Sequence, residues 1–279
     1  MQKRKLTVPQ FKEMKQAAKK IKMVTAYDYP TAVLVDRTEI EMILVGDSLG
    51  MVVLGYEGTV PVTMDDMVHH LRPVVKGAPN TFIVGDLPFM SYNITREDAI
   101  YNAGRLMKEG GADCIKLEGG VIMAPTVKAI VDAGIPVMAH IGLTPQTVSA
   151  LGGFKVQGSD ANVAKKIIED AIALEKAGAF SIVLECIPAP VARIITERLS
   201  IPVIGIGAGP WCDGQVLVTH DMLGLFDRFV PRFVKQYAKV GDIIVDALTQ
   251  YAEDVNAGTF PDLNHSFTMK EEELRQLEH

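Results

Sequence analysis

Two aspartates stand at the ends of apolar runs, where they could share a metal ion. Asp47 closes the run that begins at Met42, and Asp86 closes the run that begins at Phe82. One aspartate in such a place often caps a turn or a helix by accepting local backbone N–H groups. Because two aspartates occupy equivalent places, we favour a site at which both carboxylates meet.

A lysine and two glutamates occupy comparable places in other apolar runs. Lys116 and Glu118 lie two residues apart in an apolar run, so a strand places both side chains on one face. The alternative is a buried ion pair that only fixes packing, although such pairs are costly to desolvate. Glu185 ends a further run, and its alternative role is that of a solvated strand end.

His140 also ends an apolar run and could donate a hydrogen bond to a substrate. A histidine satisfied within the core is an equal alternative. Several acids and a lysine suit Mg²⁺, which takes few carboxylates and leaves positions open for substrate and water. A 2-oxo acid can chelate such an ion, which would act as a Lewis acid on the enolate. A separate base must then remove the proton.

Two other motifs carry less chemistry. The glycine-rich stretch 205–209 is followed by Pro210 where a dinucleotide fingerprint needs its third glycine, so we reject a Rossmann interpretation. The stretch instead predicts close backbone approach or an anion-binding loop. The cysteines, Cys114, Cys186 and Cys212, have no metal-ligand spacing and are odd in number, which favours core thiols in a reducing cytoplasm.

Short β-branched runs alternate with helical patterns along almost the whole chain, which is typical of βαβ units. Segments recur at equivalent points: residues 111–118 resemble 178–185, and 135–137 resemble 201–203. We therefore predict an α/β fold, a single (β/α)8 TIM barrel over residues 1–279, with the acids at the C-terminal mouth. The expected strands are Lys22–Tyr27, Met42–Asp47, Phe82–Asp86, Cys114–Glu118, Val137–Ile141, Ile182–Glu185, Val203–Ile206 and Val216–Val218.

Helix starts and the chain ends complete this organisation. Thr63 with Asp66, and Thr95 with Asp98, have capping-box spacing. Residues 8–20 predict an N-terminal helix that plugs the barrel bottom or meets a neighbouring subunit. Residues 268–279 are expected to form a flexible acidic tail.

Composition limits the possible partners. The formal charge of −6, with lysines scattered among acids, leaves no basic stripe for nucleic acid. No apolar run is long enough to cross a membrane. Residues 1–22 are lysine-rich and amphipathic, unlike a secretion signal, so we expect a soluble cytoplasmic protein.

Taken together, these motifs make the sequence resemble the ketopantoate hydroxymethyltransferase family, also called 3-methyl-2-oxobutanoate hydroxymethyltransferases. The resemblance runs from about residue 23 to residue 267. It rests on Gly46-Asp47-Ser48-Leu49-Gly50, Gly85-Asp86-Leu87-Pro88-Phe89, Lys116-Leu117-Glu118-Gly119-Gly120, His140-Ile141-Gly142-Leu143-Thr144-Pro145-Gln146, Gly205-Ile206-Gly207-Ala208-Gly209, Asp213-Gly214-Gln215-Val216-Leu217-Val218 and His220-Asp221.

The resemblance implies a role for each candidate residue. It assigns Asp47, Asp86 and Glu118 to Mg²⁺, assigns Asp47, Ser48, Asp86 and Lys116 to the 2-oxo acid, and makes Glu185 the proton acceptor. It further implies that the enolate of 3-methyl-2-oxobutanoate takes a one-carbon unit from 5,10-methylenetetrahydrofolate, giving 2-dehydropantoate for pantothenate synthesis. The resemblance also implies that this chain forms a homo-oligomer, as a decamer is common in the family.

Two alternatives come from other classes of protein. A Mg²⁺-dependent 2-oxo-acid lyase or phosphonomutase on a related barrel would usually carry a Lys-Lys-Cys-Gly-His loop, which the sequence lacks. A non-catalytic barrel could bind a small anion at the glycine-rich stretch, but buried charges would then have no purpose.

Overall fold

Eight parallel strands close into a barrel, because β1 pairs with β2 on one side and with β8 on the other. The computed structural model describes residues 3–153, 155–226 and 228–277. The strands are β1 Ile21–Thr25, β2 Met42–Val45, β3 Phe82–Asp86, β4 Cys114–Glu118, β5 Val137–Gly142, β6 Ser181–Glu185, β7 Val203–Ile206 and β8 Gly214–Leu217. The predicted barrel and its eight strands are confirmed. The second strand was expected to reach Asp47 but ends at Val45, so Asp47 lies in the loop that follows it.

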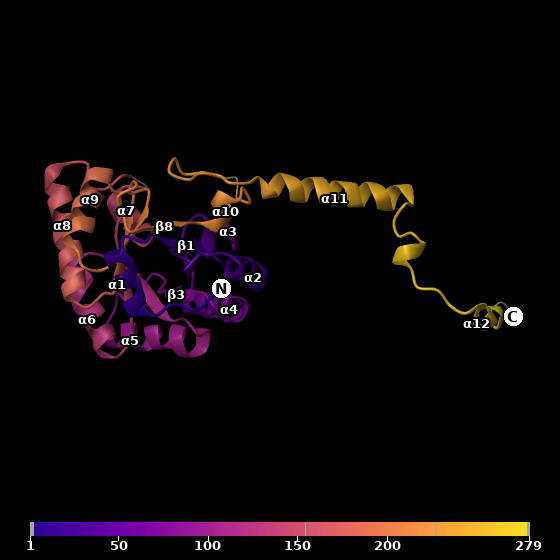
Figure 1. Cartoon of the computed structure of the whole chain (residues 1–279), viewed down its shortest axis with the longest axis horizontal. Coiled ribbons are helices and arrows are strands. Elements are labelled where there is room, and N and C mark those ends of the chain that lie inside the picture. Colours follow the sequence, from indigo (N-terminus) through magenta and orange to yellow (C-terminus); the bar gives the residue numbers. More distant parts are fainter. Residues whose placement is uncertain (1–2, 154, 227, 278–279) are drawn as a thin grey trace.

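Helices surround the barrel and connect its strands (Figure 1). They are α1 Val8–Gln16, α2 Tyr29–Asp36, α3 Leu49–Val52, α4 Met64–Gly77, α5 Arg96–Arg105, α6 Ala124–Asp132, α7 Val148–Leu151, α8 Ala161–Lys176, α9 Ala189–Arg198, α10 Thr219–Met222, α11 Val240–Ala257 and α12 Glu271–Arg275. One π-helical turn, η1 Leu106–Gly110, continues α5, and three 3-10 turns are η2 Val121–Met123, η3 Pro145–Thr147 and η4 Leu263–His265.

The two expected N-caps are present. The Thr63 side chain accepts a hydrogen bond from the backbone of Asp66, which caps α4, and Thr95 does the same from Asp98 at the start of α5. Each such cap is worth about 1 kcal/mol to its helix. Gly111, in the left-handed region at φ 81°, ends η1 and turns the chain into β4.

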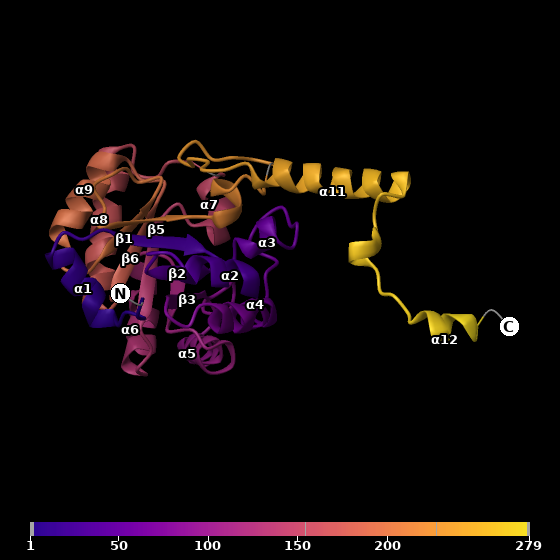
Figure 2. The same ribbon diagram turned by 45° about the vertical axis from the view of Figure 1, so that its right-hand side comes forward.

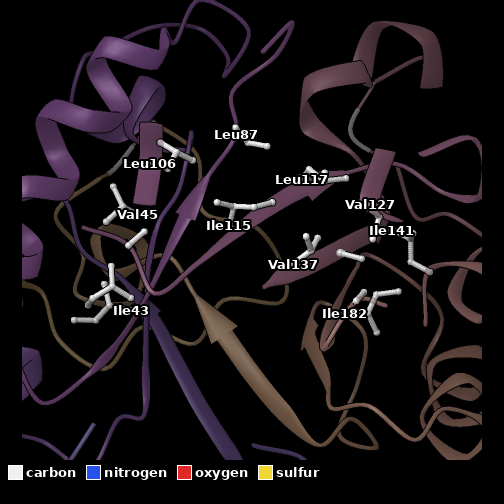
Figure 3. Packing of buried hydrophobic residues seen from close by; sticks show 14 of the residues in the cluster. Ile43, Val45, Leu87, Leu106, Ile115, Leu117, Val127, Val137, Ile141 and Ile182 are labelled. Atoms are coloured by element: carbon white, nitrogen blue, oxygen red, sulfur yellow. The ribbon is translucent and has the colours of Figure 1, made fainter. Parts of the chain in front are cut away.

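The core has two layers because successive strand residues point to opposite faces. Side chains such as Ile43, Val45, Ile115 and Leu117 point outward and pack beneath the helices (Figure 3). Fully burying one of these side chains contributes roughly 1.5–3 kcal/mol. The inward layer near the N-terminal ends of the strands is also apolar, so polar side chains are reserved for the opposite mouth.

Helix α1 closes the bottom of the barrel, which confirms the plugging role predicted for the N-terminal helix. Phe11 is fully buried and meets the ring of Phe82 edge to face, with centroids 5.1 Å apart. Lys15 Nζ lies 2.7 Å from Asp213 Oδ2, which ties α1 to the start of β8. The helix ends at Gln16, four residues before the predicted end.

Helix α11 projects away from the barrel, and none of its residues is buried (Figures 1 and 2). The helix that directly follows β8, α10, has only four residues. Lys22 of β1 and Gln215 of β8 are accordingly exposed on the outer face of the sheet. In the predicted tail, α12 is helical and exposed, while residues 278–279 lie outside the described part. In the described part, no helix combines the length and apolarity needed to span a membrane.

Candidate active site

A cavity of about 330 Å³ opens at the C-terminal ends of the strands, and every predicted site residue lines it. These residues come from β2 to β6 and the loops that follow them: Asp47, Ser48, Asp86, Lys116, Glu118, His140 and Glu185. The sequence therefore identified side chains that the barrel brings together.

Lys116 and Asp86 form a buried ion pair at the centre of this cavity. Lys116 Nζ donates to both oxygens of Asp86 at 2.7 Å, while Glu118 Oε1 is 4.0 Å away. Burial lowers the pKa of Lys116, but Asp86, Glu118 and Asp47 outweigh it, so the pKa is raised. Lys116 and Glu118 share the inner face as predicted, yet the main partner of Lys116 comes from β3.

Asp47 is a buried carboxylate that lies close to two other acids. Its backbone N–H donates to Asp86 Oδ2 at 3.3 Å, which places the two acids side by side. Burial, together with the charges of Asp86 and Glu118, raises the pKa of Asp47 to about 8. Burial also raises the pKa of Asp86, against the opposing effect of Lys116.

His140 lies between two carboxylates. Its Nδ1 is 3.4 Å from Glu118 Oε1 and its Nε2 is 3.2 Å from Glu185 Oε2, as ion pairs rather than aligned hydrogen bonds. Burial lowers the pKa of His140, but Glu118 and Glu185 outweigh it and raise the pKa to about 9. Glu118 responds in the opposite direction: burial raises its pKa, and His140 and Lys116 bring it below the ordinary value.

Glu185 is the least buried acid of the group, with 16% of its side chain exposed to the cavity. Cys186, which follows it, adopts a left-handed backbone at φ 49°, an uncommon and costly conformation for a residue with a side chain. The Cys186 N–H donates to the carbonyl of Ile206, which anchors this turn to β7. Cys186 lines the cavity, whereas Cys114 and Cys212 are the buried core thiols that the sequence predicted.

Gln146 is a positioning residue that the sequence reading missed. Its Nε2 donates to Asp47 Oδ2 and to the carbonyl of Leu87, both at 2.9 Å. Its Oε1 accepts from the hydroxyl of Tyr92 at 2.6 Å, and its backbone N–H donates to Glu118 Oε2 at 3.1 Å. One buried residue thus fixes two acids, Asp47 after β2 through its side chain and Glu118 of β4 through its backbone. The only sequence signal was its place at the end of the His140 motif.

Ser48 points to the same cavity from the start of α3. Its hydroxyl lies 2.8 Å from that of Tyr27, which is itself fully buried. Burial raises the pKa of Tyr27 beyond its usual range, so it stays a neutral hydrogen-bonding group. Asp221, a further buried carboxylate after β8, also lines the cavity, and burial raises its pKa to about 6.

The acids of the cavity offer oxygen ligands to a magnesium ion. Among residues 3–153, 155–226 and 228–277, no three His, Cys, Asp or Glu side chains form a metal-ligating group. On the floor of the cavity, four carboxylates nevertheless face one ammonium and one imidazole, and two of them, Asp47 and Asp86, are adjacent. Two carboxylates with remaining positions left to water and substrate match the preference of Mg²⁺.

The glycine-rich stretch serves close packing. A side chain on Gly207 would lie 2.8 Å from the ring of Phe233, and one on Gly209 would lie 2.3 Å from Ala189 Cβ. Both glycines also have left-handed backbones. The close-approach interpretation is therefore confirmed, whereas anion binding by this loop stays a prediction.

Sequence comparisons place the chain among enzymes of one activity. The sequence model of ketopantoate hydroxymethyltransferase matches residues 5–263. A 3-methyl-2-oxobutanoate hydroxymethyltransferase of Heliobacterium modesticaldum is 64% identical over 96% of this chain and 98% of its own length. The enzyme of that name from Moorella thermoacetica is 60% identical over 95% of this chain and 99% of its own length.

Solved structures share the fold at low sequence identity. A phosphonopyruvate hydrolase in complex with oxalate and Mg²⁺ superposes with a TM-score of 0.62, is 12% identical and covers 93% of both chains. A 2,3-dimethylmalate lyase superposes at 0.58, with 13% identity, over 94% of this chain and 91% of its own. These neighbours support the barrel fold alone.

Proposed function

The chain belongs to the ketopantoate hydroxymethyltransferase family, and from this membership we propose how its barrel mouth transfers a hydroxymethyl group to 3-methyl-2-oxobutanoate in pantothenate biosynthesis. The one-carbon donor in this proposal is 5,10-methylenetetrahydrofolate. The products are 2-dehydropantoate and tetrahydrofolate, and one water molecule supplies the new hydroxyl oxygen.

Asp47 and Asp86 would hold Mg²⁺ directly, since they are adjacent and buried. Glu118 would support the ion beside them, since its Oε1 lies 4.0 Å from the same Lys116 ammonium that Asp86 contacts. When bound, Mg²⁺ supplies a Lewis acid for the keto oxygen of the substrate. Burial raises the pKa of Asp47, and the charges of Asp86 and Glu118 raise it further, so a cation held between Asp47 and Asp86 would offset this repulsion.

Lys116 would stabilise negative charge on the substrate. Its ammonium is fixed by Asp86 and faces the cavity, so its direction is set before substrate arrives. A fixed cation stabilises a developing enolate without reorganisation at the moment of reaction. Ser48, held by Tyr27, would donate a hydrogen bond to the substrate carboxylate.

Glu185 would be the base that removes the C3 proton. It lies on β6, across the cavity from Asp47 and Asp86, and is the most exposed acid of the group. The proton moves from C3 to a carboxylate oxygen of Glu185, and the electron pair of the broken C–H bond forms the enolate. The enolate carbon then forms the new C–C bond with the one-carbon unit, whose two C–N bonds to the folate break. Water adds the hydroxyl oxygen to that carbon, and the proton from C3 and one proton of the water end on the two folate nitrogens. His140, at 3.2 Å, holds the Glu185 carboxylate in place.

This proposal rests on one observation: Glu185 lines the same cavity as Asp47 and Asp86 but comes from the opposite side of the barrel. Deuterium exchange at C3 of 3-methyl-2-oxobutanoate, followed by NMR without folate, tests it. Exchange should occur with Mg²⁺ and stop when the metal is chelated. Absence of exchange with Mg²⁺ present would overturn the proposed enolisation.

We also propose that the enzyme is a homo-oligomer built through α11. Ile244, Leu248, Tyr251 and Val255 recur at helical spacing and form an exposed apolar stripe. The outer faces of β1 and β8 border a hollow of about 520 Å³ lined by Lys22, Gly214 and Gln215. A barrel helix is expected there after β8, so the apolar face that α11 leaves bare in one copy is matched by a gap in another.

The proposed location is the cytoplasm. The three cysteines are free thiols, and a reducing compartment keeps them so. The whole chain, apart from residues 268–279, is proposed to act as one functional unit, since α11 serves assembly rather than forming a second domain.

A further inference from the structure

We propose that the rim of the cavity, formed by Lys155 after β5 and by Phe226, Phe229, Arg232 and Phe233 after β8, is the binding site for the folate, with the glutamate tail on Lys155 and Arg232 and the ring system on the phenyl side chains. This inference rests on the proposed function, because it locates the donor of the same reaction.

Cavity size shows that the donor must extend beyond the acidic floor. A volume of about 330 Å³ is at the lower end of the roughly 300–1,000 Å³ range of small-molecule sites. The 2-oxo acid occupies the floor beside Asp47 and Asp86. The remaining space takes the reacting end of a folate, and the rest of the folate must lie over the rim.

Charge decides the orientation of the folate. The floor holds four carboxylates, and Asp221 adds a fifth on the wall, so the floor repels the carboxylates of a glutamate tail. Besides Lys116 and His140 on the floor, the cavity lining in the described residues has two cationic side chains, Lys155 and Arg232, both on the exposed rim. Neither forms a salt bridge within the described part of the chain, so both are available to an anionic ligand.

Aromatic side chains lie beside these cations. Phe226, Phe229 and Phe233 line the cavity from the segment that carries Arg232. Phe229 is 65% exposed, so the face of its ring is open to a ligand. Phe233 is held firmly, because its ring packs on the bare backbone of Gly207. A flat heterocycle can stack on such rings while its anionic tail reaches the cations.

Binding of tetrahydrofolate, measured by calorimetry, tests the site without turnover. In R232A and in the double variant K155A/R232A, the dissociation constant should rise, by roughly five- to tenfold in the double variant, as expected for two partly exposed ion pairs. The dissociation constant should also rise in F229A. The effect of the cation variants should grow with a triglutamate tail, whereas the effect of F229A should not.

Arg228 provides a matched control on the same segment. It contacts Glu57 and the carbonyl of Gly55 and does not line the cavity, so R228A should bind tetrahydrofolate like the unaltered enzyme. Unchanged affinity in K155A/R232A, or an equal loss in R228A, would overturn the assignment of the rim. Folate-free exchange at C3 separates the two proposals. A failure of exchange in the unaltered enzyme would reject the proposed chemistry. The calorimetric comparison of the variants tests the folate site independently of that result.

Discussion

The Nε2 atom of His140 lies 3.2 Å from Oε2 of Glu185, and this contact joins β5 to the end of β6. On its other side, His140 faces Glu118, so one imidazole separates the proposed base from the proposed metal-supporting acid. The arrangement divides the acids of the cavity into two groups with different tasks. Substitutions in each group should therefore have separable effects.

Glu185→Gln should bind Mg²⁺ and the 2-oxo acid but fail in C3 exchange and in hydroxymethyl transfer. Glutamine keeps the shape of glutamate but accepts no proton, and general-base catalysis is worth about 10²–10⁴-fold in rate. NMR exchange and calorimetry measure the two properties. Glu197→Gln, in the exposed i,i+4 pair with Arg193 on α9, is the control and should behave normally. Exchange at the unaltered rate would make His140 the next candidate for the base.

Asp86→Ala should abolish the part of 2-oxo-acid binding that depends on Mg²⁺. The substitution removes one of two adjacent carboxylates from an ion that takes few protein ligands. Calorimetric titration of the 2-oxo acid, with Mg²⁺ and with chelator, gives the difference. Equal Mg²⁺-dependent affinity in the variant and the unaltered enzyme would exclude Asp86 from the metal site.

Lys116→Met should lower both turnover and stability. Loss of the fixed charge should reduce kcat by about 10²-fold or more, by analogy with the removal of an oxyanion donor. Because the partner Asp86 stays buried without its ion pair, the free energy of unfolding should fall by about 3–5 kcal/mol. Steady-state kinetics and urea denaturation measure the two effects. Near-normal kcat with reduced stability would show that the pair is structural.

Asp221→Asn should change how stability depends on pH. Burial raises the pKa of Asp221 to about 6 from 3.8, so the folded state binds this proton more tightly than the unfolded state. The resulting stabilisation is complete below about pH 4 and is lost as the pH rises through about 6. Asparagine does not titrate, so the variant should gain on the order of 1 kcal/mol relative to the unaltered protein between pH 4 and 7, after screening by solvent.

Urea denaturation at both pH values tests this difference. Asp242→Asn, at an exposed position on α11, serves as the control. A stability difference between the Asp221 variant and the unaltered protein that is the same at pH 4 and pH 7 would contradict the shifted titration.

Leu248→Glu combined with Ile244→Glu should reduce the oligomer. Both residues belong to the apolar stripe of α11, and a charge in a buried helix interface is costly. Sedimentation should show smaller species, with the barrel still folded by circular dichroism. Gln250→Glu adds charge to the same helix outside the stripe and should leave the assembly intact. An unchanged mass for the double variant would exclude α11 from the interface.

The barrel and the acids of its mouth could be predicted because both follow from local rules. Strand periodicity put Lys116 and Glu118 on one face, and parallel strands bring their ends to one rim. Glu185 was found for the same reason. These predictions needed no knowledge of which side chains touch.

Contacts between distant segments could not be read from the sequence. Gln146 reaches back from the loop after β5 to Asp47, and nothing in its neighbours signals that reach. The partner of Lys116 is Asp86 on β3 because hydrogen-bond geometry in the closed barrel decides between two nearby acids. An amphipathic stripe looks the same whether it packs on its own barrel or elsewhere, so the projection of α11 was missed.

Closure of the barrel through β1 and β8 has a consequence for synthesis on the ribosome. Ile21 pairs with Gly214, and the Thr219 N–H donates to Thr25 Oγ1. One edge of β1 therefore has no native partner until β8 has been synthesised. At roughly 5–20 residues per second, the 193 positions from Ile21 to Gly214 take about 10–40 s to emerge. Any sheet that forms during that interval has two unpaired edges, and an unpaired edge is a template for pairing with another chain. Chaperone demand should therefore be greatest just before residue 217 leaves the exit tunnel.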